Sequence, residues 1–264
     1  MLKKLIALLL CVLLLTGCAA LPEMAVDTGE DEKPGAGHSI GEEETGGTGH
    51  PFGDGKEAAI QPVSVTTSTV RKESDSGQGN GTQAVDLIQA QVTFDRLPAT
   101  SEELEQVDRT GENGKFVAVA LLLAAYKTWV PEDEETCAAM MAALMESPSA
   151  EGVYTEFTRS FVKERMLQNG KWAYIADAYF DGASPENGYT PGEPLTVTLR
   201  EYAYAPQIST IYGVELHVEK IVTEFSGADT ERAVSVYKDP SDGRWYVFSD
   251  TYAGLLSDVR EPEV

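Results

Sequence analysis

The chain has 264 residues, of which 43 are acidic and 20 are basic, so its formal charge is −23. This charge argues against a nucleic-acid-binding protein, because recognition of phosphates needs a concentrated basic surface. With 42% hydrophobic residues, the chain has enough apolar material for a folded domain, which excludes collagen-like, coiled-coil and fully disordered classes.

Residues 1–17 have the pattern of an export signal. Basic Lys3 and Lys4 precede an apolar run over 5–15, which is too short to cross a bilayer. The run ends in Leu-Thr-Gly-Cys, which resembles the bacterial lipobox, where the Cys receives a diacylglycerol and the chain is cut just before it. We therefore expect a lipidated Cys18 that anchors the protein to the bacterial cell membrane on its extracytoplasmic side. The alternative is an ordinary signal that is cut near Ala19-Ala20.

Residues 18–83 predict a disordered, acidic spacer behind the lipidated Cys. This stretch is rich in Gly, Glu, Ser and Thr, and it cannot bury enough apolar surface to offset the entropy of ordering. The stretch 60–70 alternates enough for a strand, but Pro62 and the lack of large apolar residues argue against a place in the core. His38 and His50 have no third ligand at close spacing, so we interpret them as part of the solvated spacer and not as a metal site.

Residues 84–264 predict a single domain that begins with a strand over 85–94 and continues with helices. Thr100 to Glu103 form a capping box that starts a short helix. The ten apolar residues 116–125 predict a central helix buried on nearly all sides, which ends before Pro131.

A third and a fourth helix are expected behind Pro131. The acidic run 132–135 is interpreted as the first turn of a helix, where carboxylates favour the positive end of the dipole, in preference to a cation site. Cys137 begins an apolar stripe at helical spacing and is expected to be an inert core thiol. Since Cys11 leaves with the signal and Cys18 carries lipid, no disulfide is expected. The following helix should end at Asn169-Gly170.

After Gly170 the apolar period changes from 3.6 to 2, which predicts strands at 195–199, 212–218, 232–238 and 244–249. The fold class is therefore α+β, with N-terminal helices packed on one face of a C-terminal antiparallel β-meander of about four strands.

The search for chemistry yields no established catalytic, cofactor or metal motif, so no cofactor is expected. His217 is the only histidine outside the spacer, and it shares a strand face with Glu215 and Glu219, which we interpret as a solvated outer face in preference to a site. The loop 181–191 is stiffened by two prolines and is the expected binding surface. Its candidate contact residues are Glu186, Asn187 and Tyr189.

Four segments resemble recurring segments of an uncharacterised family of exported bacterial proteins, which is labelled only as a domain of unknown function. They are Thr100–Arg109, Ala183–Pro191, Ser226–Asp229 and Leu256–Pro262. The resemblance covers about residues 98–262. It implies an exported domain with these boundaries, and it supplies no catalytic or ligand residues.

The expected function is a lipid-anchored, non-catalytic module that binds a cell-surface protein, peptide or glycan. One alternative is a hydrolase with its acid and base among Asp177, Asp181 and Glu186, which needs a carboxylate of raised pKa. A second alternative is a carrier that holds a small apolar ligand between the meander and the helix over 116–126.

Overall fold

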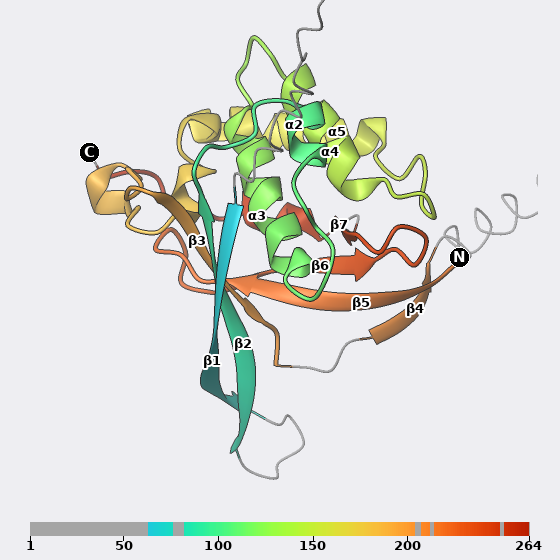
Figure 1. Ribbon diagram of the computed structural model, residues 1–264. Helices are drawn as coiled ribbons and strands as arrows, with labels where there is room; N and C mark the ends of the chain where they lie inside the picture. The colour runs from blue at the N-terminus through green and yellow to red at the C-terminus, as the bar shows by residue number, and fades with distance from the viewer. Residues whose placement is uncertain (1–62, 76–81, 204–206, 212–213, 249–250, 264) are drawn as a thin grey trace, which may run out of the picture. The chain divides into compact units, whose positions relative to one another are not determined.

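The computed structural model describes residues 63–75, 82–203, 207–211, 214–248 and 251–263 (Figure 1). These residues form an α+β fold with an antiparallel sheet, as the sequence predicts. The predicted signal peptide, Cys18, His38 and His50 lie outside the described residues. Within the described ranges, no helix combines the length and the apolar character that a membrane crossing requires.

The sheet has the strand order β1-β2-β3-β5-β6-β7, and β4 pairs with β5 beside this path. Each neighbouring pair is antiparallel. The predicted four-stranded meander corresponds to β3, β5, β6 and β7, so the sheet has more strands than predicted. The strand bounds are β1 Val63–Asp75, β2 Thr82–Phe94, β3 Leu195–Glu201, β4 Gln207–Ile211, β5 Val214–Thr223, β6 Arg232–Lys238 and β7 Trp245–Val247.

Strand β1 lies inside the range predicted to be a disordered spacer, so the predicted boundary at residue 83 is wrong. All 13 residues of β1 pair with β2, from Val63 opposite Phe94 to Asp75 opposite Thr82. Val63 and Val65 also pack against the hydrophobic core. The ladder hydrogen bonds and the valine contacts together offset the ordering entropy that short polar side chains cannot offset alone.

Four helices lie between β2 and β3 in the chain: α2 Ser101–Glu105, α3 Gly114–Lys127, α4 Glu135–Met145 and α5 Glu156–Leu167. Residues 114–126 of α3 are all buried, as the ten-residue apolar run predicts. Its side chains share one core with Val92 of β2, Val197 of β3, Ile221 of β5 and Val234 of β6. This is the interface at which the carrier alternative places a ligand.

The acidic run 132–135 mostly precedes α4, because α4 begins at Glu135 and not at residue 132. Its side chains instead cap α4 and link it to α5. Asp133 accepts hydrogen bonds from the backbone N–H and the hydroxyl of Thr136. Glu134 pairs with Arg159 of α5 at 2.8 Å and with Lys163 at 3.0 Å. The hydrogen bond from Arg159 is the main reason that the pKa of Glu134 lies below its ordinary value. The prediction that all four carboxylates form the first helical turn is therefore wrong.

A charged network ties the β1–β2 hairpin to the remainder of the sheet. Arg200 of β3 is buried and pairs with Glu231 and, at 3.3 Å, with Glu224. Lys72 of β1 pairs with the same two carboxylates. Burial alone raises the pKa of Glu231, but hydrogen bonds from Arg200 and Lys72 reverse that effect and hold it at about 2.

Candidate functional site: an acidic groove beside helix α4

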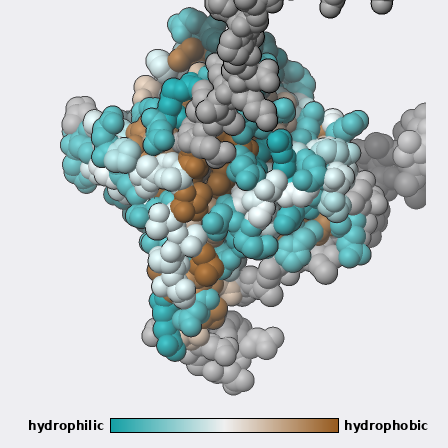
Figure 2. Space-filling view, in the orientation of Figure 1, coloured by the Kyte–Doolittle hydropathy of each residue, from teal (hydrophilic) through white to brown (hydrophobic). Residues whose placement is uncertain are grey.

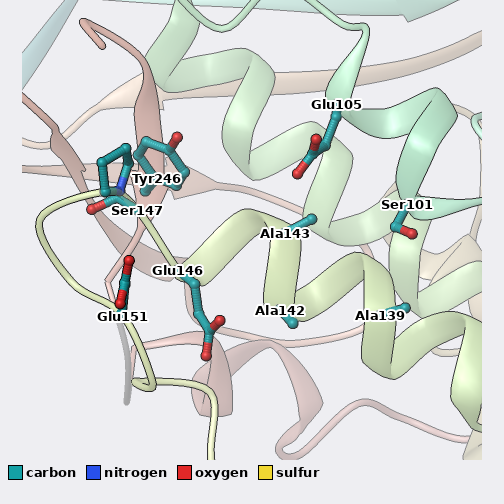
Figure 3. A pocket seen from close by; sticks show the side chains of 10 residues that line it. Ser101, Glu105, Ala139, Ala142, Ala143, Glu146, Ser147, Glu151 and Tyr246 are labelled. Carbon is teal, nitrogen blue, oxygen red and sulfur yellow. The ribbon is translucent and has the colours of Figure 1, made fainter. Parts of the chain in front are cut away.

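An open groove of about 580 Å³ runs beside α4, and we call it the α4 groove (Figure 3). Its walls come from α2, from α4 with the segment that follows it, and from strand β7, so the fold joins three distant parts of the chain here. Ten residues line it: Ser101, Glu105, Ala139, Ala142, Ala143, Glu146, Ser147, Pro148, Glu151 and Tyr246.

The floor of the α4 groove follows from the helical period of α4. Its large apolar side chains, from Cys137 to Met145, are buried on one face. Ala139, Ala142 and Ala143 lie on another face at the spacing i, i+3, i+4 and line the groove, as Figure 3 shows. Because alanine side chains are short, this face of the helix leaves a shallow apolar channel.

Three carboxylates surround this apolar floor. In Figure 3, Ser101 and Glu105 of α2 lie on one side of the alanines, and Glu151 lies on the other side with Ser147 and Tyr246. Glu105 and Glu151 are exposed and have no ion pair or hydrogen bond within the described part of the chain. The backbone N–H of Tyr154 donates to Glu146 at 3.3 Å.

Asp239 fixes the wall that carries Ser147. This carboxylate, fully buried in the turn between β6 and β7, accepts hydrogen bonds from the hydroxyls of Ser147, Ser149 and Ser241. It also accepts from the backbone N–H groups of Ser149 and Ser241, at 2.9 and 2.8 Å. Burial alone raises its pKa, but these donors outweigh burial and hold the pKa at about 2. The segment after α4 is therefore clamped to the β6–β7 turn by an ionised side chain.

Arg109 is a buried cation, only 1% exposed, that contacts two of the groove residues. Its guanidinium lies 5.0 Å from the centre of the Tyr246 ring and donates to the backbone carbonyl of Ala143 at 3.2 Å. The last turn of α4 supplies that carbonyl, and a cation is favourable at the negative end of a helix dipole. Burial lowers the pKa of Arg109. The residue thus holds α4 against β7 and stabilises the base of the groove.

The lining of the groove is negatively charged, but its carboxylates are not grouped as the ligands of a metal ion. None of its ten lining residues is basic, whereas three are glutamates. Within the described residues, no three His, Cys, Asp or Glu side chains are grouped closely enough to hold a metal ion. The chemistry that complements this groove is a cation with an apolar part.

The loop predicted to be the binding surface has a structural role in the fold. Tyr189 is only 1% exposed, stacks on Tyr174 with ring centres 5.5 Å apart, and donates to the carbonyl of Arg260. The expectation that Tyr189 is an exposed contact residue is wrong, because its positive φ of 57° and its ring contacts turn it into the core. Glu186 is exposed, and the hydroxyl of Ser184 lowers its pKa.

Asn187 makes four hydrogen bonds inside the same loop. Its carboxamide accepts from the backbone N–H groups of Ser184 and Thr190, and it donates to the carbonyls of Gly182 and Thr190. The C-terminal segment lies against this loop, since the N–H of Glu263 donates to the carbonyl of Pro185 at 2.9 Å. Asn187 thus stabilises the loop, and the chain's own end contacts it.

The other candidate residues take part in separate contacts. Asp177 pairs with Lys127, and Asp181 accepts from the hydroxyl of Thr198 at 2.8 Å. A general acid needs a raised pKa, and the pKa of Glu186 is lowered.

His217 and Glu215, which share a strand face with Glu219, are exposed, as predicted for the outer face of the sheet. Glu219 departs from the expected solvated face, because it lies 2.8 Å from the buried ammonium of Lys115 and 3.3 Å from His217. Cys137 is buried, and burial raises its pKa to about 12, as expected of a core thiol.

Sequence reasoning missed the groove residues because they lie in three separate segments of the chain. One local signal was present: Ala139, Ala142 and Ala143 form a small-residue stripe on the helix whose other face carries the methionines. That stripe indicates an uncovered channel, but only the fold brings Glu105 and Glu151 to its sides.

Fold and groove together define an α+β domain with an acidic surface groove. A family model described as "Domain of unknown function (DUF6935)" matches residues 96–263, and the chain belongs to this family. No curated protein and no solved structure matches the chain.

Proposed function

We propose that this chain is a lipid-anchored, extracytoplasmic, non-catalytic binding module whose α4 groove receives a basic peptide segment of a partner protein. The observation that carries the proposal is the groove itself, which combines an alanine floor, three carboxylates and no basic lining residue. Complementary charge steers association and selects partners, so a groove of this composition favours cationic segments and disfavours acidic ones.

A lysine or arginine side chain matches both parts of the groove. Its aliphatic stem can lie on Ala139, Ala142 and Ala143, while its charged end reaches a carboxylate at the side. Hydrogen bonds between a cationic donor and a carboxylate are stronger than neutral ones. Glu105 and Glu151 have no competing ion pair in the described part of the chain, so they can accept such donors without breaking a contact of the fold.

The hydroxyl groups of the groove fit binding better than nucleophilic catalysis. Ser147 donates to Asp239, whose pKa of about 2 makes it too weak a base to activate a hydroxyl near neutral pH. Tyr246 donates to Asp242 at 2.6 Å, and burial raises its pKa. Both hydroxyls therefore stabilise the wall of the groove.

The membrane part of the proposal rests on the lipobox that ends in Cys18. Replacing the thiol removes the acceptor of the lipid, so C18A should carry no lipid and should leave the membrane fraction. Metabolic labelling with a fatty acid tests this directly. Label that still attaches to C18A would refute the anchor and would leave the groove proposal untouched.

The groove is tested by titrating the full-length protein with a fluorescently labelled peptide rich in Lys and Arg and following fluorescence anisotropy. The wild type should bind it and should not bind a peptide with Glu at the same positions. E105Q/E146Q/E151Q should weaken binding by about tenfold, since three exposed ion pairs each contribute a fraction of a kcal/mol.

The control removes the same charge elsewhere. D95N/E164Q/E215Q changes three exposed carboxylates just after β2, on α5 and on β5, outside the groove. It should bind the basic peptide within about twofold of the wild type at physiological salt, because distant exposed charges are screened. Equal loss in both triple variants would mean that net charge alone attracts the peptide, and the groove assignment would be wrong.

A further inference from the structure

Arg109 is a buried cation beneath the α4 groove, and within the described residues no carboxylate forms an ion pair with it. Arg200 and Lys115 are buried to a similar degree, and each of them pairs with two carboxylates. Arg109 instead contacts the backbone carbonyl of Ala143 and the ring of Tyr246, and its Nε atom has no hydrogen bond in the described part of the chain. A buried charge without a counter-charge costs stability, so this arginine calls for a role beyond the fold.

The charge of Arg109 acts on the groove through space. Ala143 and Tyr246, the two residues that it contacts, both line the groove, although Arg109 itself does not. Burial is the main reason that its pKa is lowered, and Glu105 and Asp242 are among the groups that oppose this effect. Since Glu105 lines the groove, a carboxylate of the binding surface already interacts with the buried cation. An arginine stays protonated at neutral pH, so the positive charge beneath the three carboxylates is permanent.

A cation in the groove is therefore attracted by the carboxylates and repelled by Arg109. Charges inside a protein are screened less than charges in water, so this repulsion extends from the buried guanidinium into the groove. Each cationic side chain of a ligand experiences it, and the total repulsion increases with the charge of the ligand. Contact of an aliphatic stem with the alanine floor does not depend on that charge. Arg109 thus reduces the electrostatic part of the affinity and leaves the apolar part unchanged.

Attraction of charge alone would give the groove little selectivity. The chain has a formal charge of −23, and the face shown in Figure 2 is largely hydrophilic. A polycation finds negative charge at many positions on a protein of this composition. Specificity is a difference between affinities, and a repulsive element can provide it.

We propose that Arg109 is a specificity-determining residue of the α4 groove, whose buried charge disfavours polycations and selects segments with few basic residues. The inference rests on the proposed function, because it concerns the ligand of that groove. It defines the ligand class more closely, as a segment in which a lysine or arginine stem lies on the alanine floor and the neighbouring residues are mostly uncharged.

The test titrates the full-length protein with two labelled peptides of equal length, one with two lysines and one with four, and follows fluorescence anisotropy. R109M and R109Q remove the charge, and R109Q keeps a donor for the carbonyl of Ala143, whereas R109K keeps the charge. Both neutral variants should bind the two-lysine peptide about threefold more tightly than the wild type, and the four-lysine peptide about tenfold more tightly. R109K should bind both peptides within about twofold of the wild type. An arginine that only stabilised the groove wall would weaken binding when replaced, whatever the number of lysines.

A second measurement on the same variants needs no peptide. A small cationic nitroxide and its neutral analogue are added separately, and the paramagnetic relaxation of the backbone amides of Ala139, Ala142 and Ala143 is measured by nuclear magnetic resonance. The ratio of cationic to neutral relaxation should rise about twofold in R109M and R109Q and should stay unchanged in R109K. If no basic peptide binds the wild type, the proposed function is wrong, and this ratio decides the role of Arg109 by itself.

Equal peptide affinities and equal nitroxide ratios in R109M and R109K would overturn the inference. Failure of both neutral variants to fold, measured by circular dichroism melting, would also overturn it, because the charge would then serve the fold.

Discussion

The α4 groove and the loop 181–191 are both polar surface features, but they use their polar groups in opposite ways. In the loop, the carboxamide of Asn187 makes four hydrogen bonds to its own segment, and the hydroxyl of Tyr189 is bonded to the carbonyl of Arg260. In the groove, Glu105 and Glu151 are exposed without such partners in the described part of the chain. Polar groups that the fold already satisfies stabilise it, whereas charged groups left unpaired around an apolar floor are available to a ligand.

The comparison predicts that substitutions in the loop reduce stability and that substitutions in the groove reduce binding. The largest effect on stability is expected for Y189A, because truncating a buried aromatic leaves a cavity and removes the stack on Tyr174. The free energy of unfolding should fall by about 4 kcal/mol, measured by urea denaturation. Y189F, which loses only the hydrogen bond to Arg260, should lose about 1 kcal/mol. A Y189A protein as stable as the wild type would contradict the structural role of Tyr189 in the loop.

A smaller loss is expected for N187A. Removing the carboxamide leaves the backbone groups of Ser184 and Thr190 without their partner, which should cost about 2 kcal/mol in the same denaturation experiment. E186A serves as the control in the same loop, and its exposed side chain should change stability by less than about 0.5 kcal/mol. If N187A weakened binding of the basic peptide without loss of stability, the loop would be a binding surface after all.

Acid should destabilise the protein through Asp239 and Glu231. Both carboxyls have pKa values of about 2 in the folded chain, below their ordinary values of 3.8 and 4.5. Between about pH 2 and the ordinary pKa of each carboxyl, the folded state therefore binds fewer protons than the unfolded state. Their stabilising contribution is complete above about pH 4.5 and is lost as the pH falls toward 2. Urea denaturation of D239N across this range should show a shallower decline than the wild type, and parallel curves would contradict the assignment.

The smallest change in stability is expected in the groove. E105Q/E151Q replaces two exposed carboxylates that have no ion pair or hydrogen bond in the described residues, so the free energy of unfolding should change by less than about 0.5 kcal/mol. The same denaturation experiment measures it. A loss of several kcal/mol would show that these carboxylates stabilise the fold and are not free for a ligand.

Several helices and helix ends were predictable because each depends on residues that are neighbours in the sequence. The apolar run of α3, the Thr100 cap of α2 and the left-handed stop at Asn169-Gly170 all depend on neighbours in sequence, and the structure contains each of them. Strand β1 was misjudged because its stability comes from pairing with β2 and from two valines that reach the core, which composition does not show.

The site was harder to predict than the fold for a related reason. Tyr189 is an amphipathic residue in a loop, as binding residues often are. Its burial follows only from the stack on Tyr174 and from the C-terminal segment that contacts this loop. The α4 groove depends on contacts between α2, α4 and β7, which lie far apart in the chain. Buried Arg109 is an example, because its guanidinium contacts a helix carbonyl and a tyrosine ring, while Glu105 and Asp242 act on its charge through space.

The most direct test of the central claim is to map, by nuclear magnetic resonance on the full-length protein, which backbone amides shift when the basic peptide is added. The shifts should cluster at Ala139, Ala142 and Ala143 and in the segment 147–151, while the amides of 184–190 should stay unchanged. E105Q/E146Q/E151Q should reduce these shifts at the same peptide concentration, to the extent expected from binding that is about tenfold weaker. Shifts that cluster in 184–190, or that spread evenly over the acidic surface, would contradict the account.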